Sequence, residues 1–398
     1  MKAVRQESHR PLPPFGDLPP AFFVLDRSLK EAQEAALQQA GFEPVDVPPA
    51  QEPYLLYRDD CWFTAAFLKK IPKTGATGRV LLSDALYLQF CGPLQQDAAH
   101  PPVALIAAGA PPSLEGPDLP IDLGLHDVDE MNLHPAVAHA SMGKMRSGAA
   151  MVHPIEHWTH LLRVNLLAML SRGEQYRLDF EQAPIWSKLW QVLKVLWNSN
   201  SLSVAGLARG LSRIGKGCNI HPTAVIEATE LGDGVEVGPF AVLRGCVVGA
   251  GAKIEAYGHA SLSVIGPKAR VGDGAMINLA VLMPEAFVSR GDGFQMSLFG
   301  RESFLAVGAT ILDLSFGKTI RVDHDGERRD SGVYFLGACI GHRAKVGNGV
   351  RISYGTVVPN DAFLVGPSHD LLRRWPEGTE SPARVVEGAA TAVRRGDS

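Results

Sequence analysis

Apolar residues in the second half of the chain recur with a period of 17 residues. After Ile214 the sequence divides into four lines of this length, in which aliphatic residues follow one another at intervals of five, six and six. Neither a helical period of 3.6 residues nor simple alternation fits this spacing. The resulting columns are Ile214, Leu231, Val248, Ile265 and Leu282; Ile220, Val237, Ile254 and Val271; and Ile226, Leu243, Ala260 and Ile277. One aliphatic side chain per face, directed at a common axis, predicts a parallel left-handed β-helix of hexapeptide repeats from Ile214 to Val358.

Glycine follows the first column in every line, and the register later breaks and returns. The glycines are typical of sharp corners, where a residue without a side chain has little steric cost. They are Gly215, Gly232, Gly249 and Gly266. The spacing breaks between Leu282 and Ile340 and resumes at Val346, Ile352 and Val357. The polar stretch 323–330 within the break predicts a loop that leaves the coil. This excursion is either a ligand-binding loop on a rigid scaffold or a solvated turn.

The first half of the chain alternates strand-like and helix-like segments, which favours an α/β sheet domain. The predicted strands are AFFVLD (21–26), FEPVDV (42–47), YLLY (54–57), RVLLSDALYLQF (79–90) and PPVALIAAG (101–109). The segment 28–41 predicts a helix with Ser28 as its N-cap and Gly41 at its C-cap.

Two further helices are expected before the repeat begins. One of about 17 residues starts after His153, and APIWSKLWQVLKVLWN (183–198) forms the second, with three tryptophans and two leucines on one face. We expect that face to pack between the two domains; attachment to a membrane surface is the alternative. The predicted division is a flexible lead-in (1–20), the α/β domain (21–150), a helical linker (151–212), the β-helix (213–375) with an excursion near 315–332, and a C-terminal tail (376–398).

Composition narrows the possible environments. The chain has 398 residues, of which 46% are hydrophobic, and a net charge of −4. No block of basic residues suited to a phosphate backbone is present, so nucleic-acid binding is not expected. The five cysteines form no CxxC pair, which favours free thiols in a reducing cytoplasm. We expect neither a signal peptide nor a membrane span, because no apolar run is long enough.

Several acidic residues and histidines could carry chemistry in the first half. Asp59 and Asp60 follow a predicted strand, as does Asp84, and a carboxylate there can hold a metal-bound phosphate in α/β enzymes. A helix N-cap or a loop acid is the alternative for each. His153, His157 and His160 have helical spacing, whereas His134 and His139 lie further upstream. A metal site is conceivable at the spaced group, but Pro154 follows His153 directly, so capping and packing roles are favoured.

The last third, in which GKTIRVDHDGERRDSGVYFLGACIGHRAKVGNGV (317–350) ends an excursion in Ser-Gly and returns to a coil, resembles a family of sugar-nucleotide transferases. The nearest type is the bifunctional N-acetylglucosamine-1-phosphate uridyltransferase / glucosamine-1-phosphate acetyltransferase. The resemblance implies a nucleotidyltransferase-like α/β domain, a left-handed β-helix and a homotrimer. It further implies sugar phosphates or nucleotide sugars as substrates, and Mg²⁺ where the first domain is active. That family has a Gly-rich phosphate loop after its first strand, and none follows AFFVLD here.

The same resemblance implies acyl-CoA-dependent transfer at the β-helix, with a histidine as general base. The family's histidine and the tyrosine that follows it align with Arg290 and Gly293, so the base is missing from its usual position. Candidate substitutes are His259, His324 and His342. Candidate groups for binding substrate or cofactor are Asp313, aligned near the family's asparagine, Lys318 and Arg321, aligned near its basic pair, and Arg328 and Arg329 on the excursion.

Three functions are consistent with the sequence. The first is a transferase of the sugar-nucleotide type, with acyl transfer at the β-helix favoured over nucleotidyl transfer. The second is a relative that keeps the fold and a binding or regulatory role but has lost the chemistry. The third is a metal-dependent hydratase that uses histidines between subunits.

Overall fold

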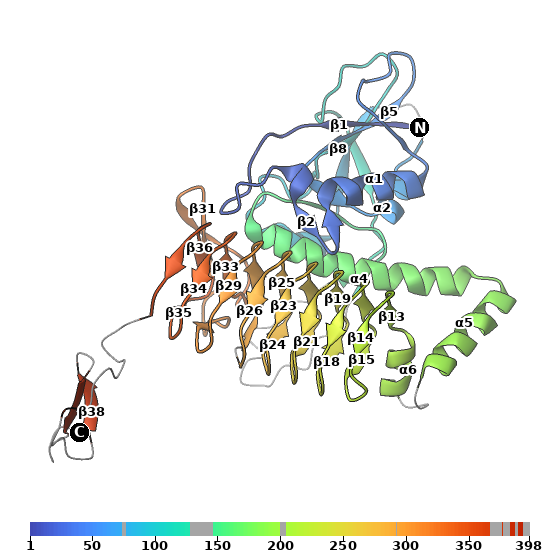
Figure 1. The fold of residues 1–398 in the computed structure, drawn as a ribbon. Helices are drawn as coiled ribbons and strands as arrows, with labels where there is room; N and C mark the ends of the chain where they lie inside the picture. Colours follow the sequence, from blue (N-terminus) through green and yellow to red (C-terminus); the bar gives the residue numbers. More distant parts are fainter. Residues whose placement is uncertain are drawn as a thin grey trace.

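A computed structural model describes residues 1–73, 77–127, 146–199, 204–291, 293–366, 376, 383–386 and 389–392. An α/β part lies against one side of a prism of stacked short strands, and a long helix runs between them (Figure 1). The chain therefore has the two-part organisation expected from its pattern. The predicted tail lies mostly outside the described residues; within it, β38 (Ala383–Val386) pairs with β39 (Ala389–Ala392).

The α/β part is built on a six-stranded mixed sheet of order β4-β1-β5-β8-β7-β9. Its strands are β1 (Lys2–Gln6), β4 (Glu43–Val45), β5 (Tyr54–Arg58), β7 (Gly78–Leu82), β8 (Val103–Ile106) and β9 (Asp118–Ile121). The first residues are thus not a flexible lead-in, because β1 lies between two parallel partners. Ala3 and Val4 are buried on its opposite faces, which offsets the conformational entropy lost on ordering the terminus.

Short elements complete this part. The strands β2 (Phe23–Val24) and β3 (Arg27–Ser28) form a ribbon, and so do β6 (Cys61–Phe63) with β12 (Val152–Pro154) and β10 (His126–Asp127) with β11 (Arg146–Ser147). The 3-10 helix η1 covers Pro19–Ala21, and α2 covers Ala65–Lys70. The second half of the predicted strand 79–90 is instead α3 (Ala85–Cys91), which Asp84 caps by accepting from the Tyr87 amide.

The helix predicted over 28–41 is confirmed as α1 (Leu29–Ala40). Ser28 and Glu31 form a capping box, in which each side chain accepts a hydrogen bond from the other residue's backbone amide. Gly41 ends the helix in the left-handed conformation, at φ 76°. Both ends are set by residues within the segment itself, so the sequence alone was sufficient to locate them.

The prism has three faces, which we name the docked, outer and pocket sheets. The docked sheet contains β13 (Arg213–Ile214), β16 (Glu230–Leu231), β19 (Val247–Val248), β22 (Val264–Ile265), β25 (Val281–Leu282), β28 (Leu298–Phe299), β33 (Cys339–Ile340) and β36 (Val357–Val358). The outer sheet contains β14 (Asn219–Ile220), β17 (Glu236–Val237), β20 (Lys253–Ile254), β23 (Arg270–Val271), β26 (Phe287–Val288), β29 (Phe304–Leu305), β34 (Lys345–Val346) and β37 (Phe363–Leu364). The pocket sheet contains β15 (Val225–Glu227), β18 (Val242–Arg244), β21 (His259–Ser261), β24 (Met276–Asn278) and β27 (Gly293–Gln295).

Neighbouring strands within each sheet are parallel, and the pairing confirms a β-helix with the 17-residue repeat. The period continues past Leu282, since Val281 pairs with Leu298 and Ile277 with Phe294. The prediction ended the regular coils too early because phenylalanines, Phe294 and Phe299, take the inward positions there. The interruption proper falls between β28 and β33, where β30 (Thr310–Ile311) pairs with β35 (Arg351–Ile352).

The excursion is an ordered hairpin rather than a loop. β31 (Arg321–His324) pairs with β32 (Glu327–Asp330) around a turn at Asp325 and Gly326. Ile320 and Val322 are buried in the same apolar cluster as the core of the α/β part. The excursion therefore packs against the first half of the chain, which fixes its position.

The helix α4 (Trp158–Gln182) joins the two parts and is longer than predicted. Its first half is buried, and the core of the α/β part continues through it to the prism. The docked sheet turns apolar side chains outward beneath α4, so its strands from β19 to β33 are buried on both faces. These outward residues are Val247, Val264, Val281, Leu298 and Cys339.

The helix α5 (Ile185–Asn198) contradicts the prediction that its tryptophans pack between the domains. It lies at the end of the molecule beyond α4, beside α6 (Val204–Gly210) (Figure 1). Trp186, Trp190 and Trp197 are all exposed. The long helix α4 occupies the interface instead and leaves no apolar surface there for α5. In the part of the chain that the structure describes, no helix combines the length and apolarity needed to cross a bilayer.

Candidate functional site

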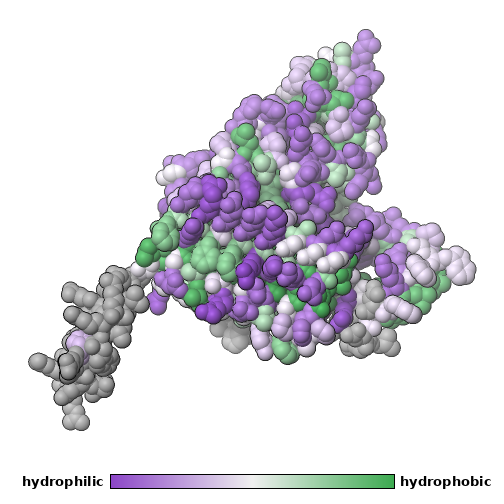
Figure 2. Space-filling model, viewed as in Figure 1, coloured by the Kyte–Doolittle hydropathy of each residue, from purple (hydrophilic) through white to green (hydrophobic). Residues whose placement is uncertain are grey.

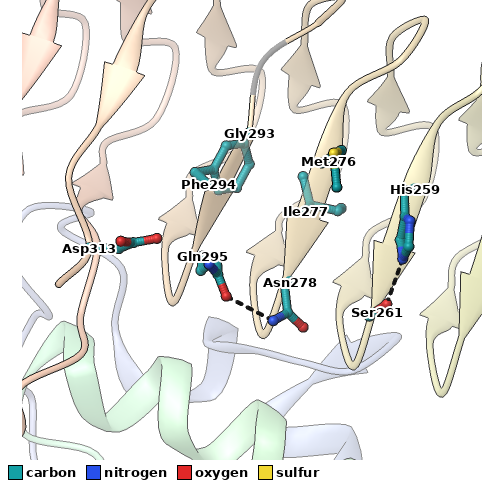
Figure 3. A pocket seen from close by; sticks show the side chains of 9 residues that line it. All are labelled: His259, Ser261, Met276, Ile277, Asn278, Gly293, Phe294, Gln295 and Asp313. Carbon is teal, nitrogen blue, oxygen red and sulfur yellow. Dashed lines mark hydrogen bonds between the residues drawn. The ribbon is translucent and has the colours of Figure 1, made fainter. Parts of the chain in front are cut away.

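A pocket of about 390 Å³ opens on the pocket sheet of the prism. In each strand of this sheet the middle residue points into the prism, and its two neighbours point outward. Gly293 occupies an outward position without a side chain, which hollows the face beside Met276. Figure 3 shows the lining residues, which are His259, Ser261, Met276, Ile277, Asn278, Gly293, Phe294, Gln295 and Asp313.

His259 and Ser261 form one end of the pocket. The His259 Nε2 and Ser261 Oγ atoms are 2.9 Å apart, a hydrogen bond that fixes the imidazole plane. Burial lowers the pKa of His259 below its usual 6.5, and the positive charge of Arg244 lowers it further. The imidazole is therefore neutral near pH 7, which is the state that can accept a proton.

The rest of the pocket is lined by amides and one carboxyl group. Asn278 Nδ2 donates to Gln295 Oε1 at 2.9 Å (Figure 3). Burial raises the pKa of Asp313, which lies on the opposite side of the pocket from His259. Three coil steps separate β21, which contains His259, from β30, which Asp313 follows, and at the usual strand spacing this is about 14 Å. Asp313 therefore does not orient His259; the two groups would contact different parts of one ligand.

Sequence reasoning identified His259 and Asp313 but missed Ser261, Asn278 and Gln295. The repeat itself contained the signal, because the outward positions of the pocket sheet recur every 17 residues just as the inward ones do. The series Glu227, Arg244, Ser261, Asn278 and Gln295 is polar throughout. Its first two members form an ion pair at 2.8 Å, and the last three line the pocket.

His324 lies between the two parts of the molecule rather than in the pocket. Its ring packs edge-on against that of His157, with centroids 5.2 Å apart. His157 Nε2 contacts the Asp323 carbonyl oxygen at 2.9 Å. Burial lowers the pKa of both histidines, to about 4 for His157. These contacts hold the excursion against the α/β part.

His342 is also at an interdomain contact. Its Nδ1 accepts a hydrogen bond from the Arg301 amide at 2.9 Å, and its Nε2 lies 3.2 Å from an Asp17 carboxylate oxygen. Arg301 Nη2 donates to both Asp17 oxygens at 2.6 Å. We call Asp17, Arg301 and His342 the clamp, because it ties the segment before η1 to the prism.

The four basic candidates belong to the excursion, and none lines the pocket. Arg321 donates to the Arg328 carbonyl across the hairpin, and Arg329 pairs with Glu327 at 3.3 Å. Lys318 and Arg328 are exposed. Their assignment to substrate or cofactor phosphates stays a prediction.

The acidic candidates of the α/β part have protein partners. Asp59 accepts a hydrogen bond from the Ser8 amide at 3.0 Å. Asp60 is buried and accepts from Arg58 at 2.7 Å; burial raises its pKa despite that arginine. Asp84 caps α3 and pairs with Arg146 at 3.0 Å. These contacts match the capping and loop roles given as the alternative to phosphate binding.

The spaced histidines do not share one helix face. His153 lies in β12, His157 caps α4, and His160 lies in its first turn. Burial lowers the pKa of His153 to about 3 and that of His160 well below 6.5. Among the residues that the structure describes, no group of three or more His, Cys, Asp or Glu side chains could hold a metal ion. His134 and His139 lie outside those residues.

Comparison with known proteins finds distant structural likenesses. No protein-family model and no curated protein matches the chain. The polysialic acid O-acetyltransferase OatWY matches at 18% identity over 46% of this chain and 90% of its own, with a TM-score of 0.20. The polySia-specific acetyltransferase NeuO matches at 14% identity over 46% and 83%, with a TM-score of 0.16. Both scores are too low to support an argument about activity.

Proposed function

We propose that this protein is an acyltransferase that works at the pocket around His259. The donor is an acyl-CoA thioester, and the acceptor is a hydroxyl or amino group of a sugar derivative. One observation carries the proposal: a neutral histidine, fixed by a hydrogen bond to Ser261, lines an open pocket together with two amide side chains and the carboxyl group of Asp313. This arrangement suits proton abstraction beside a polar, uncharged acceptor.

The chemistry requires one base. When the Nε2–H of His259 donates to Ser261 Oγ, Nδ1 holds the free lone pair and accepts the proton from the acceptor. The acceptor oxygen or nitrogen then forms the new bond to the thioester carbon. The carbon–sulfur bond breaks, and the thiolate leaves with the proton that His259 had taken. Because Asn278 donates to the Gln295 oxygen, the Gln295 amide nitrogen stays available to the polar groups of a bound substrate.

Release of free CoA thiol from an acyl-CoA, in the presence of a panel of amino sugars and sugar phosphates, tests the proposal directly. We expect His259→Ala to lower kcat/KM by about 10²- to 10⁴-fold, the usual contribution of a general base. His221→Ala is the matched control, since His221 also bonds a hydroxyl two residues on, from Nδ1 to Thr223 Oγ1 at 2.9 Å, but lies outside the pocket. Activity of His259→Ala within a few-fold of wild type would refute the assignment.

A binding role without turnover is the second candidate. The observation in its favour is that Ser261, rather than a carboxylate, is the partner of His259, so nothing anionic stabilises a protonated imidazole there. Calorimetry with an acyl-CoA and an acceptor sugar distinguishes the two candidates, because this role requires saturable binding without thiol release. The trimer that the resemblance implies stays a prediction, which sedimentation analysis would test.

A further inference from the structure

The helix α5 carries its apolar side chains on the outside of the molecule. Trp186, Trp190 and Trp197 are 80%, 71% and 90% exposed. Ile185, Leu189, Val192, Leu193 and Leu196 are exposed as well. Figure 2 shows hydrophobic side chains on the surface at the end of the molecule where Figure 1 places α5. An exposed apolar surface of this kind marks a site of interaction.

The packing of α5 on α6 shows which face is turned outward. A Cβ atom on Gly210 would lie 2.3 Å from the Val195 carbonyl oxygen and 2.8 Å from its side chain, so the two helices touch at Val195. Successive residues are about 100° apart around a helix. On this scale Val195 lies on the same half as Ser187 and Gln191, opposite the apolar arc. The helix therefore packs with its polar side and presents an apolar arc of about 160° to solvent.

The two charged residues of α5 are both lysines. Lys188 and Lys194 each lie about 40° beyond one edge of the arc, at positions from which long side chains can extend along a surface. The sequence from Ala183 to Ile226 contains no Asp or Glu, although acidic residues outnumber basic ones in the whole chain, 42 to 38. Within that segment the basic residues are Lys188, Lys194, Arg209, Arg213 and Lys216.

We propose that α5 docks this protein on the surface of an anionic lipid bilayer. Tryptophans and aliphatic residues on one face, with lysines at both edges, are the features that place a helix in the plane of a membrane interface. Because the segment from Ala183 to Ile226 contains basic residues and no acidic ones, the negatively charged lipid headgroups attract it. A second copy of the chain would equally cover apolar residues, but it would gain nothing from an acid-free, basic surround.

Flotation of the full-length protein with vesicles of phosphatidylcholine, with and without phosphatidylserine, tests this proposal. We expect the wild-type protein to float with the anionic vesicles at low salt, and less at high salt because the attraction is screened. Trp190→Glu/Trp197→Glu should abolish flotation. Lys188→Gln and Lys194→Gln should each weaken binding about fivefold, as expected for one basic residue near the surface.

Phe363→Glu is the matched control, because Phe363 is 71% exposed on β37, at the other end of the prism. It should float like the wild type. Wild-type protein that stays unbound in the presence of anionic vesicles overturns the proposal, and so does flotation of the double tryptophan variant. Light scattering in the absence of lipid tests whether a second copy of the chain covers this face instead. If the wild-type protein is an oligomer and Trp190→Glu/Trp197→Glu converts it to monomers, the face belongs to a second copy and the proposal is overturned.

Discussion

Removing the Asp17 carboxylate should lower the free energy of unfolding by more than the loss of one exposed ion pair would. Asp17 is the only acid of the clamp, and its side chain is 15% exposed while that of Arg301 is 33% exposed. Burial raises the pKa of Asp17, but the hydrogen bonds from His342 and Arg301 outweigh that effect and lower it overall. Asp17→Ala leaves a half-buried guanidinium without its charged partner, and we expect a loss of about 2–3 kcal/mol in the free energy of unfolding.

Urea unfolding, followed by circular dichroism, measures this change. Asp325→Asn is the matched control: it removes the charge from an ion pair with Arg10 at 3.0 Å whose carboxylate is 57% exposed, and asparagine tolerates the positive φ of 53° at this turn. It should cost less than about 1 kcal/mol. The difference in the free energy of unfolding between wild type and Asp17→Ala should stay constant from neutral pH to about pH 4. Because the folded pKa is lower than the unfolded one, it should then vanish as the pH falls through the folded pKa. A cost no larger than that of Asp325→Asn would refute the role assigned to the clamp.

Three further predictions concern the pocket and the buried histidines. The acid limb of the pH–rate profile should lie below pH 6.5, and Arg244→Gln should move it to higher pH by removing the charge that lowers the pKa of His259. Gly293→Leu should abolish acceptor binding with little change in thermal stability, since its Cβ would meet Met276 only at ordinary contact distances of 3.7–3.8 Å. Stability should fall as the pH drops from 6.5 towards 4, because unfolded His157 takes up a proton that the folded form excludes. His157→Gln should reduce this slope by about 1.4 kcal/mol per pH unit in urea unfolding.

Sequence periodicity was sufficient to predict the structure wherever nearby residues determine it. The capping box at Ser28 and the inward columns of the prism both depend on residues within one helix or on a constant 17-residue offset. The same offset places His259 and its polar neighbours on one face. Handedness, by contrast, stays a prediction of the repeat pattern.

Predictions failed where contacts join distant segments. His324 ends strand β31 and His342 lies at a corner of the prism, and a sequence pattern cannot reveal that the α/β part covers them. β1 was mistaken for a flexible lead-in because the Pro-rich residues after it dominate the composition of the first twenty. The outward face of α5 was assigned to a core because apolar periodicity indicates a face suited to burial, without saying what would cover it.

The docked sheet changes how this prism holds together. A free-standing repeat array gains stability only from neighbouring coils, so it can fray from either end and tolerates the loss of whole units. Here the coils from Val247 to Cys339 are also held laterally by a second core, which includes α4 and the α/β sheet. Amide hydrogen exchange should therefore show these coils opening together with the first half of the chain, whereas the coil that starts at Ile214, whose contacts with α4 are between polar side chains, should open at a lower free energy. Insertion or deletion of a repeat within the laterally held block would shift its apolar side chains out of register with α4, so the number of coils is fixed by the neighbouring domain rather than by the repeat.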